Sequence, residues 1–198
     1  MTRIPKQIPC QFTRLSSHLL RLIPILALVL TVSTANAQTL ATGGKAPNFT
    51  LLTPTGSSVS LDSDTSKGTT VLVFLRGFPG YQCPYCVRQV HDFAEHSSDF
   101  AAKMVRVLFV YPGPPAALGD HAKEFLTQEA DLPANIQLVV DPDYKVTNLY
   151  GLRWDAPHET AYPSTFILDN HRTIKFEKIS HAHGDRTTAE DVLNQIGR

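Results

Sequence analysis

Two cysteines three residues apart, Cys83 and Cys86, are the side chains of this 198-residue chain best suited to chemistry. They follow the apolar run 70–75, which predicts a buried strand, and Pro84 between them is typical of the first position of a helix. A helix that begins at Cys83 places this thiol at the positive end of the helix dipole, which stabilises a thiolate. Cys86 then lies one turn later on the same face, within disulfide reach. The spacing therefore predicts a redox dithiol.

Residues 1–37 have the pattern of an export signal that is removed. Four basic residues and no acidic residue accompany an apolar stretch at 22–32, and Ala35 and Ala37 form a small-x-small cleavage pattern. An uncleaved membrane anchor is the alternative, but these 11 residues are far fewer than the ~20 that a spanning helix needs. We therefore expect a mature domain of residues 38–198 that is periplasmic or secreted and has no stable membrane span.

The charge and size of that mature domain limit what it does. Without the four basic leader residues, its 161 residues carry 14 basic and 18 acidic side chains, a net charge of −4. This length suits one domain with a proper hydrophobic core. A mildly acidic chain without basic clusters gives no support to nucleic-acid binding.

Loss of the leader also removes Cys10, so Cys83 and Cys86 become the only cysteines of the mature chain. In an exported protein the alternative for such a pair is a structural disulfide. A bridge that closes so short a loop removes little chain entropy, however, and stabilises the fold weakly. A zinc site needs four ligands, and no second cysteine pair exists to complete one. We therefore predict redox chemistry at the dithiol, without a cofactor or a metal.

The apolar pattern predicts one α/β domain with a central mixed sheet flanked by helices. An extended lead-in covers 39–66, with a hairpin that ends at 59–61. Strands are expected at 71–75, 105–111 and 136–140, and helices at 83–100, 118–126 and 144–150. A final hairpin pairs 165–168 with 173–178. The closing helix opens with a capping-box spacing at 187–190.

The chain resembles the thioredoxin-fold redoxins of the alkyl hydroperoxide reductase/thiol-specific antioxidant (AhpC/TSA) family. The resemblance rests on three segments, 46–51, 83–86 and 162–169, and covers nearly all of the mature chain. It implies a thioredoxin-like fold in which the dithiol opens the first long helix. It also implies a cis proline that faces the dithiol, and Pro163 is the residue that matches.

This family divides into two chemistries. Peroxidatic members resemble the pattern Pro-x-x-x-Thr-x-x-Cys, in which the Thr and a distant Arg hold peroxide against a thiolate. Pro79 and Cys86 match that spacing, but Cys83 stands in place of the Thr and Pro163 in place of the Arg. A CxxC pair with a cis proline is what the dithiol oxidoreductases of this fold show. The resemblance therefore favours disulfide exchange.

The roles of the site residues follow from this chemistry. Cys83 is expected to attack a disulfide, and Cys86 to resolve the mixed disulfide that results. Pro163 is expected to orient backbone groups beside the dithiol, with an ordinary loop proline as the alternative. For Arg76 two interpretations stay open: a charge that lowers the pKa of a thiol, or a solvated residue at the end of a strand.

Three aromatic residues, Phe78, Tyr81 and Tyr85, are candidates for an apolar rim suited to a protein partner, or else they pack on neighbouring loops. The expected partners are protein thiols and disulfides and an upstream redox partner.

Two further functions remain as alternatives. A thiol peroxidase would reverse the roles, with Cys86 as the peroxidatic thiol and Cys83 as its resolving partner. A copper-carrying relative of this fold uses two cysteines and a distant histidine, so His158 or His183 is a candidate third ligand of a copper carrier.

Overall fold

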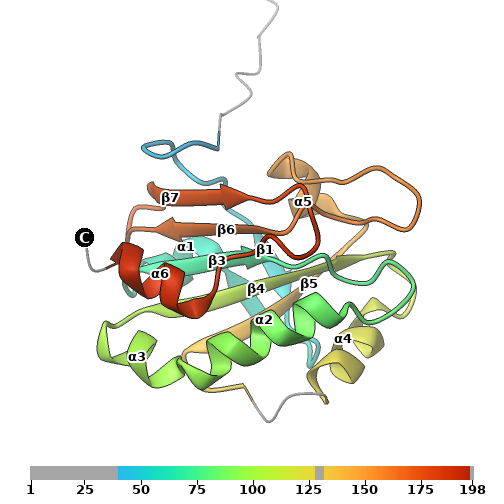
Figure 1. Cartoon of the computed structure of the whole chain (residues 1–198), viewed down its shortest axis with the longest axis horizontal. Coiled ribbons are helices and arrows are strands. Elements are labelled where there is room, and N and C mark those ends of the chain that lie inside the picture. The colour runs from blue at the N-terminus through green and yellow to red at the C-terminus, as the bar shows by residue number, and fades with distance from the viewer. Residues whose placement is uncertain (1–39, 128–131, 197–198) are drawn as a thin grey trace, which may run out of the picture. The chain divides into compact units, whose positions relative to one another are not determined.

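The computed structural model describes residues 40–127 and 132–196, so the predicted leader 1–37 lies outside the described residues. A seven-stranded mixed sheet, in the order β2-β1-β5-β4-β3-β6-β7, runs through the described chain (Figure 1). Its elements are β1 Thr50–Leu52, β2 Ser58–Ser60, α1 Leu61–Thr65, β3 Thr70–Phe74, α2 Pro84–Glu95, α3 Ser97–Ala102, β4 Arg106–Gly113, α4 Leu118–Leu126, β5 Ile136–Pro142, α5 Lys145–Leu149, β6 Ser164–Leu168, β7 Ile174–Ile179 and α6 Ala189–Ile196. No helix in the described ranges has the length and apolarity to cross a membrane.

The register of the sheet brings two predicted site segments to one edge. Strands β3, β4 and β5 are parallel, whereas β6 pairs with β3 in the antiparallel sense. Phe74 at the end of β3 therefore pairs with Ser164 at the start of β6. Pro163 directly precedes β6, so it lies at the edge where the chain leaves β3 for the dithiol.

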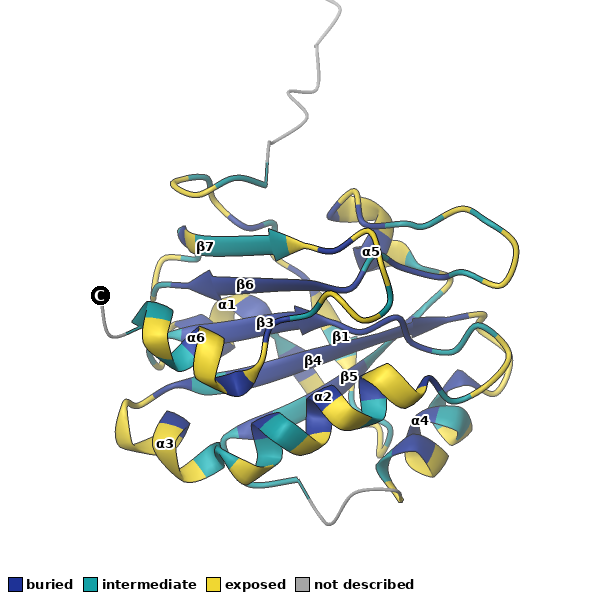
Figure 2. Cartoon of the chain, in the orientation of Figure 1, coloured by how far each residue is buried: buried dark blue, intermediate teal, exposed yellow. Residues whose placement is uncertain are grey.

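Both faces of the central strands are buried (Figure 2). Alternate residues of β3 contribute to different cores: Val71 and Val73 to the core beneath α2, α4 and α6, and Leu72 and Phe74 to the core beneath α1 and α5. Helices on both faces explain why the strands are continuous apolar runs rather than alternating ones. The expected central mixed sheet flanked by helices is confirmed.

Two predicted elements differ from the structure. The expected helix 83–100 is two helices, because His96 between α2 and α3 has a non-helical backbone and its ring contacts the Asp92 carbonyl oxygen at 2.8 Å. The predicted lead-in ended as a strand at Leu61, but Leu61 begins the short helix α1 and is fully buried.

The capping box of α6 forms one residue later than the spacing predicted. Thr188 Oγ1 accepts the Asp191 N–H at 3.1 Å, and an Asp191 carboxylate oxygen accepts the Thr188 N–H at 2.9 Å. Thr187, the residue expected to cap, is buried instead and its hydroxyl bonds that of Thr165 at 2.7 Å. Tertiary contact with β6 therefore shifts the cap.

Candidate active site

The dithiol occupies the beginning of α2, as predicted. Cys83 is the N-cap residue, with an extended backbone (φ −78°, ψ 115°), and Pro84 takes the first helical position. The Cys86 N–H donates to the Cys83 carbonyl oxygen at 2.9 Å, which closes the first turn. Both thiols are free in the structure.

A close approach of two backbones fixes the path from β3 to the dithiol. Gly77 has φ +73°, and a Cβ at this position would lie 1.9 Å from the Pro112 carbonyl oxygen. That carbonyl accepts the Phe78 N–H at 2.9 Å. Only glycine fits here, since it has no side chain and tolerates positive φ. The Gly77 N–H also bonds the Cys86 sulfur and works to lower its pKa.

Both cysteines belong to the core beneath α2, with exposed fractions of 1% for Cys83 and 0% for Cys86. A partner sulfur reaches Cys83 only when side chains around the thiol move aside. Cys86 lies one helical turn after Cys83 and has no exposed surface. The arrangement therefore orders the two thiols, with Cys83 as the outer one.

The pKa of Cys83 is lowered to about 5. The largest cause is a hydrogen bond from the Cys86 thiol, and burial opposes it. The amides of Cys86 and Tyr85 and the charge of Arg186 lower the pKa further, although the Cys83 side chain makes no regular capping hydrogen bond. Amides at a helix start favour an anion. With a pKa of about 5, Cys83 is a thiolate at neutral pH.

The pKa of Cys86 shifts in the opposite direction. Complete burial raises it well above the ordinary value, because a charged thiolate loses its hydration. The interaction with Cys83 raises it again, and the charge of Arg186 counteracts only part of the rise. Cys86 therefore keeps its proton and donates it in a hydrogen bond to the Cys83 thiolate.

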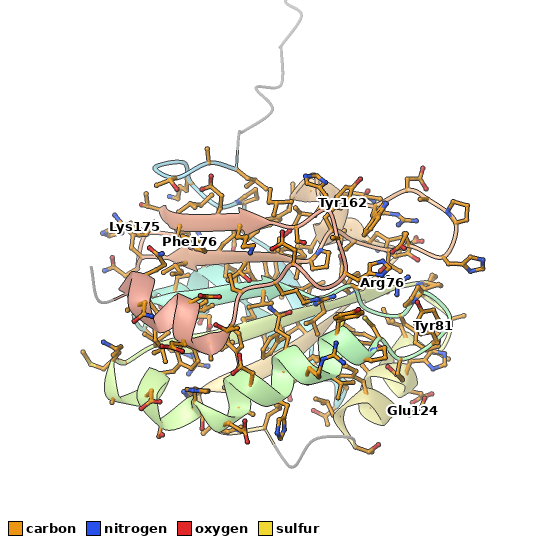
Figure 3. All side chains as sticks on the ribbon, viewed as in Figure 1. Arg76, Tyr81, Glu124, Tyr162, Lys175 and Phe176 are labelled. Atoms are coloured by element: carbon orange, nitrogen blue, oxygen red, sulfur yellow. The ribbon has the colours of Figure 1, made fainter. Side chains whose placement is uncertain are left out.

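Arg76 is buried, with 2% of its surface exposed, so the interpretation as a solvated strand end is wrong. Its Nε donates to a Glu159 carboxylate oxygen at 2.7 Å and its Nη2 to the His158 carbonyl oxygen at 2.6 Å. Its Nη1 donates to the Tyr81 hydroxyl, and the two side chains lie at the same end of the sheet (Figure 3). Although burial opposes its charge, the bonds to Glu159 and Tyr81 and a smaller one to Cys83 raise the Arg76 pKa. Glu159 largely offsets this charge.

Sequence reasoning missed a second arginine at the dithiol, Arg186, whose charge acts on both thiols. It lies in the loop between β7 and α6, about a hundred residues from Cys83. No local motif marks it. Only the hydrogen bonds that fold this loop against α2 bring it to the site.

Pro163 is buried, and its carbonyl oxygen accepts the Ser180 N–H at 2.9 Å. The sheet register places it at the dithiol edge, as described above. The cis form of the Tyr162–Pro163 bond stays a prediction.

The three candidate rim residues separate into two groups. Tyr81 and Tyr85 are exposed, at 47% and 41%. Phe78 is partly buried and stacks on His121 at 3.7 Å between ring centres, which matches packing on a neighbouring element. Exposed aromatic surface beside the dithiol therefore comes from the two tyrosines.

One of the candidate copper ligands, His183, has its ring engaged by another residue. His183 Nε2 lies 2.9 Å from a Glu159 carboxylate oxygen, and His158 contributes its backbone carbonyl to Arg76. Within the described ranges, no group of three or more His, Cys, Asp or Glu side chains is placed to hold a metal ion. The geometry gives no support to a copper site.

Two cavities flank the sheet at opposite ends. One of about 390 Å³ lies at the far end from the dithiol and is lined in part by Lys175 and Phe176 (Figure 3). Another of about 260 Å³ lies beside α2 and is lined by Tyr85, Arg88, Gln89, Asp92, Gly184, Arg186, Thr187 and Thr188.

The fold and the dithiol define a thioredoxin-fold redox enzyme. Residues 42–177 match the AhpC/TSA family, and the chain belongs to this family. A protein of Mycobacterium tuberculosis H37Rv, named provisionally as a peroxiredoxin, is 31% identical over 135 residues, which cover 66% of this chain and 79% of that protein.

Solved structures of two kinds share the fold. The peroxidoxin BcpB of Mycobacterium tuberculosis aligns with a TM-score of 0.65 at 20% identity, over 79% of this chain and 96% of that one. A protein of Chlorobium tepidum, described provisionally as the thiol:disulfide interchange protein DsbE, aligns with a TM-score of 0.59 at 26% identity, over 80% and 96%. The structural neighbours thus include both peroxiredoxins and a thiol:disulfide interchange protein.

Proposed function

We propose that this protein is an exported thiol–disulfide oxidoreductase that acts on protein disulfides through Cys83 and Cys86. The observation that carries the proposal is the opposite acidity of the two thiols: Cys83 at the helix start has a pKa of about 5, whereas burial holds the pKa of Cys86 well above its ordinary value. An acidic outer thiol and a protonated inner thiol suit an attacking and a resolving role.

In the reducing direction, the Cys83 thiolate attacks one sulfur of a partner disulfide. A Cys83–partner bond forms, the partner disulfide breaks, and its second sulfur leaves as a thiolate. Cys86 then attacks the Cys83 sulfur and its proton passes to the departing thiolate. The Cys83–Cys86 disulfide forms, and two electrons have moved to the partner. The reverse sequence oxidises a partner dithiol.

The interaction between the thiols helps the second step. The Cys83 thiolate raises the pKa of Cys86 through its charge and through the hydrogen bond between them. Both effects end when Cys83 enters the mixed disulfide, because its sulfur is then neutral. The pKa of Cys86 therefore falls when this thiol must become a nucleophile.

Export and protein partners belong to the same proposal. The pattern of residues 1–37 supports export, and the exposed rings of Tyr81 and Tyr85 beside the dithiol support a protein substrate. In an oxidising compartment a reductive cycle also requires an upstream partner that reduces the dithiol. Fractionation of producing cells, with the mature N-terminus read by mass spectrometry, tests the export: protein retained with residues 1–37 in the cytoplasm would contradict it.

Peroxide reduction is the second candidate, because the related Mycobacterium tuberculosis protein bears a peroxiredoxin name and Pro79 and Cys86 match the peroxidatic spacing. Complete burial and a raised pKa make Cys86 a poor first thiol for this reaction, however. The geometry supports disulfide exchange better.

Parallel assays separate the two functions. Purified protein, Cys83→Ser and Cys86→Ser are compared in the reduction of a protein disulfide and in the consumption of hydrogen peroxide. We expect exchange to be lost in Cys83→Ser and to stall as a mixed disulfide on Cys83 in Cys86→Ser. Exchange at the wild-type rate in Cys83→Ser would overturn the proposal, and peroxide consumption no faster than by a free small thiol would remove the second candidate.

A further inference from the structure

Arg186 is held against the helix that carries the dithiol. Its Nε donates to the His183 carbonyl oxygen at 2.7 Å, and its Nη1 donates to the Gln89 side-chain oxygen at 2.9 Å. Gln89 in turn donates to the Thr187 carbonyl oxygen at 3.1 Å. Gln89 is buried on α2, three residues after Cys86, so the two side chains share one face of the helix. Gln89 thus fastens the loop before α6 to the dithiol face.

The remaining donor nitrogen of Arg186, Nη2, is enclosed and has no hydrogen-bond partner in the described structure. A buried N–H group without an acceptor is costly and uncommon in folded proteins. Arginine cannot relieve the cost by losing its proton, because its pKa is too high. An anion close by would supply the missing interaction.

The two arginines of the site differ in how their charge is used. Arg76 is paired with the Glu159 carboxylate at 2.7 Å, and its bond to Cys83 is a smaller one. Arg186 has no carboxylate within ion-pair distance among residues 40–127 and 132–196, and its hydrogen bonds go to a backbone carbonyl and an amide oxygen. Its charge is therefore available to the sulfur atoms.

We propose that Arg186, positioned by Gln89, supplies a positive charge that helps to stabilise the Cys83 thiolate and thereby favours the reduced over the disulfide form of the pair. This inference rests on the proposed function, since it assigns a residue to the same dithiol. Its consequence is that Arg186 makes the dithiol more oxidising, because a pair whose thiolate is stabilised accepts electrons more readily.

The test uses the protein produced with its own leader and then purified. Four variants are compared with it: Arg186→Gln removes the charge, Arg186→Lys keeps it, Gln89→Glu places a carboxylate against the guanidinium, and Arg88→Gln is the matched control. Arg88 is an exposed arginine of the same helix, with its guanidinium over the Tyr85 ring. Ultraviolet absorbance of the thiolate, alkylation rates across pH and the redox equilibrium with glutathione are measured for each.

For Arg186→Gln we expect about a tenfold smaller thiolate fraction of Cys83 on the acidic side of its titration. We also expect a shift of the glutathione equilibrium toward the disulfide by about tenfold, or ~30 mV. Gln89→Glu should shift both measurements in the same direction while Arg186 is retained. Arg186→Lys should recover part of the effect, and Arg88→Gln should match wild type.

If Arg186→Gln does not fold, the Cys83 titration and the glutathione equilibrium of Gln89→Glu are compared with those of Arg88→Gln instead. The inference would be overturned if Arg186→Gln and the Arg88→Gln control showed the same Cys83 titration and the same glutathione equilibrium. This holds even if the wild-type protein exchanges disulfides. Failure of the wild-type protein to exchange disulfides would instead overturn the proposed function, and the titration of Cys83 would still report on Arg186.

Discussion

Helices α2 and α6 begin in different ways: the start of α6 contributes to stability, whereas the start of α2 serves the chemistry of a thiol. The start of α6 is capped by side chains: Thr188 and Asp191 bond each other's amides, and an Asp92 carboxylate oxygen accepts the Ala189 N–H at 2.7 Å. The start of α2 has Cys83 as its N-cap, without a regular capping hydrogen bond. The amides of Tyr85 and Cys86 instead lower the pKa of the Cys83 thiol.

Substitutions at the two helix starts should therefore have different consequences. At α6 the amides contribute to the free energy of unfolding, because side-chain oxygens satisfy them. At α2 they serve a sulfur that must remain reactive. A change at α6 should alter stability and leave exchange intact, whereas a change at α2 should alter chemistry first.

The largest expected effect concerns the hydrogen bond between the thiols. Cys86 is the leading cause of the low Cys83 pKa, so Cys86→Ala should raise that pKa from about 5 toward the ordinary thiol value. Cys86→Ser keeps a hydroxyl donor and should raise it less. The pH dependence of Cys83 alkylation measures both. A Cys83 pKa that stays near 5 in both variants would show that the helix amides and Arg186 account for the acidity without the Cys86 thiol.

A smaller effect is expected at α6. Thr188→Ala removes the hydroxyl that accepts the Asp191 N–H and should lower the free energy of unfolding by about 1 kcal/mol. Thr188→Ser is the control, since it keeps the hydroxyl. Denaturant titration measures stability, and disulfide exchange is assayed at a temperature where all forms are folded. A large loss of exchange in Thr188→Ala would mean that the two helix starts are not independent.

The smallest effect compares two inactive variants of α2. Cys83→Ser offers a hydroxyl to the amides of Tyr85 and Cys86, whereas Cys83→Ala offers none, so the serine variant should be more stable by about 0.5–1 kcal/mol. Neither variant contains the Cys83 thiolate, so its charge does not contribute to the difference in stability. Thermal unfolding of the two forms under reducing conditions gives the result. Equal stabilities would show that the serine hydroxyl does not cap these amides.

Local sequence patterns predicted the start of the site well. The apolar run followed by Cys83, Pro84 and Cys86 predicted the strand, the helix start and the position of the dithiol. Each of these features depends on residues that are close in the sequence. The continuous strands also predicted a sheet covered on both faces.

Long-range contacts account for what the sequence did not predict. Hydrogen bonds to Gln89 and His183 hold Arg186 beside α2, and Glu159 offsets the charge of Arg76 from a distant loop. The capping box of α6 lies one residue later than predicted because the Thr187 hydroxyl is hydrogen-bonded to that of Thr165. Such pairings depend on how loops fold against the sheet and leave no periodic pattern.

The central claim is that Cys83 is the reactive thiolate of the pair. Alkylation of the reduced wild-type protein by a small reagent across pH, with the modified residue identified by mass spectrometry, tests it most directly. Cys83 should be modified first, with a half-maximal rate near pH 5, while Cys86 stays unmodified in the folded protein. Modification of Cys86 first, or a midpoint near the ordinary thiol value of about 8.5, would contradict it.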